Sequence, residues 1–224
     1  MFPGKKKGLK ISLLVLLILL VNVVGFAEES GKISIDGDLF TMFFNQDIIT
    51  VEKSVKILYD DMVITAEKAQ YNRDIEEVTI EEDVLVTQGD NTIRSPFLWL
   101  DVKEEYIIFK GGVEAIYYTD VNDTEEPEPI HIWSDTLDAW NGGDNALAKG
   151  KVKAIYQNFT LTAQEAHLDR QKETLTMLGN VYVERDDGSW LSCQKGVYDF
   201  VKETITAYGS VTDKVKSEFG RPGN

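Results

Sequence analysis

The sequence predicts an all-β protein, built as an elongated, rolled β-sandwich of six stacked repeats. Three observations lead to this prediction: a template of about 29 residues that recurs six times, an apolar periodicity of two residues inside each copy, and turn-forming residues between the apolar runs. The composition suits a folded domain, because 43% of the 224 residues are hydrophobic and 27% are charged.

The N-terminus predicts export from the cytoplasm. A lysine-rich start (residues 5–10) precedes an apolar run (residues 11–24), and small residues at Gly25 and Ala27 mark a cleavage point. We therefore expect a signal peptide over residues 1–27. The alternative is an uncleaved anchor in the inner membrane, because the apolar stretch 9–26 reaches the lower limit for a span.

The remainder, residues 28–224, is expected to form one domain. With 23 Lys and Arg against 38 Asp and Glu, the chain carries a formal net charge of -15, which argues against a nucleic-acid partner. The single Cys193 excludes an internal disulfide, and it occupies a column of small, buried residues.

No catalytic residue, cofactor or metal site is predicted. Two histidines are too few for a site built mainly from imidazoles, and His167 falls in an outward column where a solvated side chain is expected. Paired acids such as Asp186-Asp187 lie at turns, where solvated charge is the default. The alternation of side chains along a strand places Trp99 and Trp133 on the outer face. Contact with sugars through these rings is possible, but it is only weakly indicated.

The spacing between key residues is the same in every copy of the repeat. Each copy holds a small residue, namely Gly37, Ala66, Ser95, Ser134, Ala163 and Cys193. Eighteen residues later, every copy has a valine: Val55, Val84, Val113, Val152, Val181 and Val211. Length changes fall only between copies, and the largest is an acidic, proline-bearing insertion that we expect to form a surface loop at about residues 118–130.

Each copy predicts two strands, and each strand is expected to bend. Around Ala66 the apolar positions Ile64, Ala69 and Tyr71 change parity, which keeps both halves facing inward only if the strand turns a corner there. Four copies carry a glycine two residues before the valine, which suggests a second corner in the return strand. Six copies stacked at about 4.8 Å predict a body about 29 Å long.

The interior is left open at this stage. Inward columns contain Ile, Leu, Val and Phe, together with alanines such as Ala69, Ala146, Ala148 and Ala163. Small side chains favour an apolar groove along the stack, whereas a filled core is the usual state of a β-sandwich. Periodicity does not separate the two.

This repeat pattern resembles the OstA-like repeat of the periplasmic lipopolysaccharide-transport proteins of the LptA and LptC type. Their loose pattern is met by Leu161-Thr162-Ala163, Leu168-Asp169 and Leu175-Thr176-Met177-Leu178-Gly179-Asn180-Val181. The resemblance covers nearly all of residues 33–213, and it departs from the pattern in the first copy and at Trp140.

This resemblance implies a β-jellyroll whose open apolar groove holds lipid acyl chains, with no catalysis. The groove residues that it implies are Ile64, Val78, Ile80, Val84, Ile93, Leu98, Leu100, Ile107, Phe109, Val113, Ile132, Leu137, Val152, Leu161, Leu168, Leu175, Met177 and Val181.

The resemblance also implies a role in outer-membrane biogenesis. Lipopolysaccharide or a related glycolipid would pass between the inner and outer membranes along a periplasmic bridge. Edge strands near residues 33–49 and 205–215 would pair with other β-jellyroll proteins or, head to tail, with further copies of the chain.

Two other functions stay open: an LptC-like membrane-anchored component, and a structural scaffold with a filled core at the cell surface. Because lipopolysaccharide and the chain are both acidic, the lipid phosphates are expected either near bases such as Lys149, Lys151 and Lys153 or with divalent cations.

Overall fold

The protein is an open ladder of antiparallel strands, described here from a computed structural model. The structure describes residues 34–43, 45–59, 62–118, 129–140, 144–199, 201–202 and 204–214. Within these ranges every regular element is a strand, as the sequence predicts. The same ranges contain no helix long and apolar enough to cross a bilayer. The predicted signal peptide or anchor lies outside the described residues, as do positions 119–128 of the acidic insertion.

Fourteen strands form one sheet. Their bounds are β1 (Ser34–Asp36), β2 (Leu39–Phe43), β3 (Ile48–Tyr59), β4 (Met62–Asn72), β5 (Glu77–Gln88), β6 (Asn91–Asp101), β7 (Tyr106–Tyr118), β8 (Pro129–Trp140), β9 (Asn145–Tyr156), β10 (Phe159–Asp169), β11 (Thr174–Arg185), β12 (Trp190–Asp199), β13 (Thr204–Tyr208) and β14 (Thr212–Lys214).

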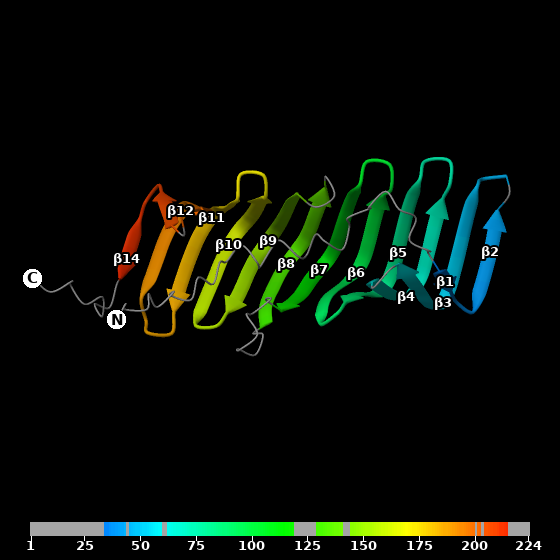
Figure 1. Cartoon of the computed structure of the whole chain (residues 1–224), viewed down its shortest axis with the longest axis horizontal. Coiled ribbons are helices and arrows are strands. Elements are labelled where there is room, and N and C mark those ends of the chain that lie inside the picture. The colour runs from blue at the N-terminus through cyan, green and yellow to red at the C-terminus, as the bar shows by residue number, and fades with distance from the viewer. Residues whose placement is uncertain are drawn as a thin grey trace, which may run out of the picture.

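The strands follow one another along a single axis (Figure 1). From β3 to β13 each strand pairs with the next in sequence, and the short strands β1 with β2 and β13 with β14 form the two free edges. Each copy therefore adds two strands to the ladder. The expected length of about 29 Å is wrong, because it allowed one strand per copy, and twice as many strands at about 4.8 Å double it.

Both predicted corners are present, and they coincide. In the β4–β5 pair, for example, the register shifts between Thr65 and Lys68, and the extra residue lies in β5. Positive φ angles mark the same point of the odd-numbered strands, as at Glu82 and Asp83, at Gly111 and Gly112, and in the following copies. One β-bulge per copy thus bends the whole ladder along one line.

The bends divide the sheet into two wings. Wing A contains the residues two before each small residue, namely Ile35, Ile64, Ile93, Ile132, Leu161 and Leu191. Wing B contains those five after it, namely Met42, Tyr71, Leu100, Ala139, Leu168 and Tyr198. Side chains from both wings form one hydrophobic core. The fold is the all-β jellyroll expected from the sequence.

A bulge glycine should be sensitive to substitution for a reason that a turn glycine does not share. At Gly179 (φ +74°) an added Cβ would lie 2.2 Å from Gln164 Oε1 and 2.9 Å from Gln164 Cβ, whereas at Gly89 (φ +56°) it would meet nothing within 4 Å. Both alanine variants carry left-handed backbone strain, of about 1–2 kcal/mol. We expect Gly179→Ala to lower the free energy of unfolding further than Gly89→Ala by about 1–2 kcal/mol in urea titrations. Equal losses would mean that the bulge tolerates a side chain.

Candidate functional site

An apolar cavity of about 330 Å³ lies between the wings in the N-terminal half of the ladder. Wing A contributes Ile35, Ile57, Met62, Ile64 and Val86 to its wall. Wing B and its turns contribute Ile49, Val51, Ala69, Gln70, Tyr71, Val78, Ile80, Leu98, Leu100, Val102 and Ile107. No lining residue carries a formal charge, so the site suits an uncharged, apolar occupant.

The cavity extends to the free edge formed by β1 and β2. Its outermost lining residue, Ile35, is 46% exposed, whereas Leu98 deeper in the ladder is 1% exposed. Phe40 and Met42 lie opposite the inward residues Val51 and Ile49, and both are about half exposed. These side chains extend the apolar wall to the end of the molecule.

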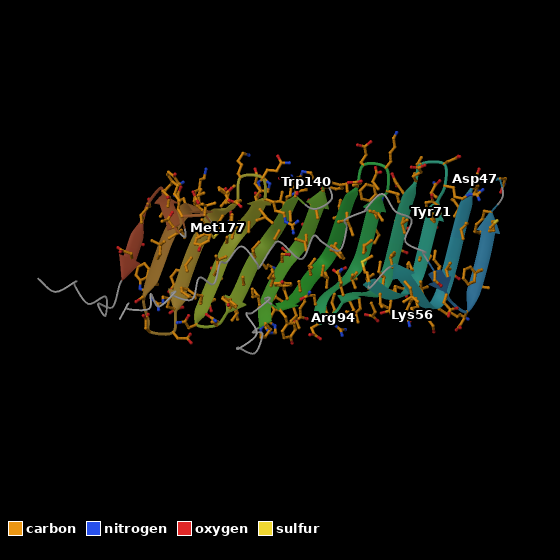
Figure 2. All side chains as sticks on the ribbon, in the orientation of Figure 1. Asp47, Lys56, Tyr71, Arg94, Trp140 and Met177 are labelled. Atoms are coloured by element: carbon orange, nitrogen blue, oxygen red, sulfur yellow. The ribbon has the colours of Figure 1, made fainter. Side chains whose placement is uncertain are left out.

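Further along the ladder the interior is closed to solvent. Leu168, Met177 and Val181 are 0% exposed. Figure 2 shows the contrast in position, with Tyr71 near the N-terminal end of the ladder and Met177 well toward the other end. The sequence left a groove and a filled core as alternatives, and the structure places an open cavity at one end of a buried core.

The residues that the sequence analysis assigned to a groove divide into two groups. Six of them line the cavity, namely Ile64, Val78, Ile80, Leu98, Leu100 and Ile107. The others pack in the core and do not line this cavity: Val84, Ile93, Phe109, Val113, Ile132, Leu137, Val152, Leu161, Leu168, Leu175, Met177 and Val181.

Sequence reasoning missed ten residues of the lining. They are Ile35, Ile49, Val51, Ile57, Met62, Ala69, Gln70, Tyr71, Val86 and Val102. Most of them occupy the same inward columns as the residues that were chosen. Extending every column back into the first copy would have found Ile35, Ile49, Val51 and Ile57, but that copy departs from the repeat pattern.

The outer surface of wing B carries an aromatic strip. Ring centroids are 6.1 Å apart for Trp99 and Tyr106, 6.1 Å for Tyr106 and Trp140, and 5.7 Å for Trp140 and His167. The expectation that His167 is solvated is wrong: its ring is partly buried and stacked on Trp140, and its Nε2 is enclosed without a hydrogen-bond partner. These contacts stabilise neighbouring strands.

A carboxylate is buried beside this strip. Asp138 is 6% exposed, and its Oδ2 accepts hydrogen bonds from the Tyr106 hydroxyl at 3.2 Å and from Lys149 Nζ at 3.1 Å. Burial, and then the charge and hydrogen bond of Asp138, raise the pKa of Tyr106 above its ordinary value. The ion pair with Lys149 compensates the buried charge.

Each of the three bases that were considered as partners for lipid phosphates has a local contact in the structure. Lys149 pairs with Asp138, Lys151 lies 4.0 Å from Asp135, and Lys153 lies over the Trp133 ring at 5.6 Å. None of the three lines the cavity. In the described part of the chain, His, Cys, Asp and Glu form no group that could hold a metal ion.

A known protein family matches more than half of the chain. Residues 63–204 match a family model described as "LptA/(LptD N-terminal domain) LPS transport protein". No curated protein sequence matches the chain. Among solved structures the chain is similar to LptH from Pseudomonas aeruginosa, described as the LptA homologous periplasmic component of the conserved lipopolysaccharide transport device. That match has 10% identity, covers 83% of this chain and 96% of the other, and has a TM-score of 0.23.

An apolar cavity should take up xenon, as cavities lined by aliphatic side chains do. We expect xenon under pressure to shift the methyl resonances of Ile64, Ile80 and Leu100 in NMR spectra. The methyl groups of Leu168 and Val181, in the closed part of the core, serve as the internal control. Equal shifts in both sets, or none at Ile64 and Ile80, would contradict the position of the cavity.

Removing the carboxylate at position 138 should make Tyr106 easier to ionise. In Asp138→Asn the negative charge that opposes the phenolate is gone, so the pKa of Tyr106 falls toward its ordinary value, and the effect of burial alone remains. Ultraviolet titration, with Tyr106→Phe to identify the signal, measures the change. An unchanged pKa would mean that burial alone raises it.

Proposed function

Because the chain belongs to the LptA/(LptD N-terminal domain) family of lipopolysaccharide transport proteins, we propose that it carries the acyl chains of lipopolysaccharide in the cavity between its wings. The observation that supports this proposal is the chemistry of the lining, which is apolar and uncharged and reaches the free edge of the ladder. The role is binding and transfer, without catalysis or a cofactor.

Binding would be driven by burial of methylene groups. Each buried CH₂ contributes about 0.8 kcal/mol, so a single acyl chain gains substantial affinity without directed polar contacts. The cavity lies at the small end of the range of about 300–1,000 Å³ that holds compact ligands. It would therefore enclose part of a multiply acylated lipid, while the charged head group stays in water outside the mouth.

We also propose that the chain acts in the periplasm, exported by residues 1–27, as one module of a bridge between the two membranes. The free strands β1 and β2 at one end, and β13 and β14 at the other, present unpaired backbone groups. The edge of another β-jellyroll protein could continue the ladder there by β-augmentation. Its own inward side chains would then continue the apolar interior past the mouth of the cavity.

Filling the cavity should abolish lipid binding without unfolding the protein. Val78 lines the cavity opposite Tyr71 and Leu100, whereas Thr79, the next residue of β5, lies on the outer face beside Trp99. We expect Val78→Trp to reduce bound lipid at least tenfold and Thr79→Trp to leave it unchanged. Overpacking at Val78 costs about 1–3 kcal/mol, so circular dichroism must confirm the fold.

The measurement is native mass spectrometry with lipid extraction. The protein is produced from its full sequence in a host that makes lipopolysaccharide. Lipid A-type species on the wild type and on Thr79→Trp, but not on Val78→Trp, would support the proposal. Folded wild-type protein that carries no lipid and takes up none from added lipopolysaccharide would overturn it and favour a structural scaffold.

A further inference from the structure

One inward position of the C-terminal edge carries a charge where the rest of its column is apolar. Within the chain, every interface between consecutive copies uses the same register: the valine faces the small residue of the next copy, and the residue two after the valine faces the residue two before the small residue. That second column of wing A contains Ile57, Val86, Ala115, Ala154 and Val183. Its sixth member, in the edge strand β14, is Asp213.

The register places Asp213 on the inner face of the sheet. Asp213 lies opposite Leu191, and Leu191 lies opposite Val183, which packs against the core. Residues directly opposite one another in an antiparallel sheet share a face. The carboxylate is exposed because β14 ends the ladder, and a strand added there would cover it.

Wing B of this edge would accept a second copy of the chain. In the shared register, Ile205 would face Met42, Ala207 would face Phe40, and Tyr208 would face Leu39. Ile205, Tyr208, Leu39, Phe40 and Met42 are all exposed large apolar side chains. Stacking them head to tail would remove apolar surface from water on both partners.

Wing A would oppose the same arrangement. There Asp213 would face Ile35, and a carboxylate would be buried against an aliphatic side chain with no base or hydrogen-bond donor in that column. Burying an unpaired charge is far more costly than the neighbouring apolar contacts are favourable. Inward-pointing charges are a known means of protecting sheet edges from unwanted pairing.

We propose that Asp213 prevents the chain from stacking on further copies of itself, and that the C-terminal edge takes a different β-jellyroll protein whose facing residue is a lysine or arginine. This inference rests on the edge pairing in the proposed function. It restricts the partner of strands β13 and β14 to a different protein, whose base opposite Asp213 would form a buried ion pair.

Charge reversal across the edge tests the inference. Asp213→Val removes the unpaired carboxylate. In Ile35→Lys each copy presents a base to the Asp213 of the neighbouring copy. We expect the wild type to be monomeric, and both variants to self-associate at least tenfold more tightly. In the double variant a lysine again faces an apolar residue, so the protein should return to a monomer. Thr206→Val, which adds an apolar group on the outer face of β13 opposite Val197, is the control.

Sedimentation velocity over a range of concentrations measures the association, using protein produced from the full sequence and verified by circular dichroism. Ile35→Lys is the decisive variant, since adding a charge does not favour non-specific aggregation. Wild-type protein that assembles as tightly as Asp213→Val, or folded Ile35→Lys and Asp213→Val that both stay monomeric, would overturn the inference. Lipid content measured on the wild type and on Asp213→Val, neither of which alters the cavity lining, reports separately on the proposed function.

Discussion

The structure depends on one backbone constraint, which is that each odd-numbered strand from β3 to β11 carries one residue more than its neighbours at the same point. Side chains alternate between the faces of a strand, yet the inward residues Ala66 and Ala69 of β4 lie an odd number of positions apart. The partner strand β5 spans the same point with one residue more, in a bulge with positive φ angles, and the pair of strands bends there. Both halves then face the interior, and the two wings can enclose a core.

The fold could be predicted because this constraint leaves a trace in the sequence. The invariant valines, the small residues eighteen positions earlier and the glycines at the bulge are all spaced by the ladder itself. At Gly179 an added side chain would meet Gln164 of the preceding strand, whereas the first two copies have Lys53 and Glu82 at this position. The valines and small residues recur in all six copies and the glycine in four, and this repetition makes the requirement visible.

The position of the cavity could not be predicted in the same way. Alanines suggested space along the whole stack, yet Ala146, Ala148 and Ala163 are buried in the core, and of the alanines in the inward columns only Ala69 lines the cavity. Empty space depends on how two wings approach one another, which parity does not encode. The stacking of His167 on Trp140 was missed for a similar reason, because the two residues come from strands that are not consecutive.

A cavity that reaches a free strand edge can be extended by a further strand. Ile35 lines it at this edge, exposed Phe40 and Met42 lie on the neighbouring strand β2, and the next wall would belong to whatever strand pairs with β1 and β2. Occupancy of the edge and occupancy of the cavity are then thermodynamically linked, and each must change the affinity of the other by the same factor. A strand added at this edge would thus change how tightly the cavity binds an apolar ligand, without contacting its deeper part.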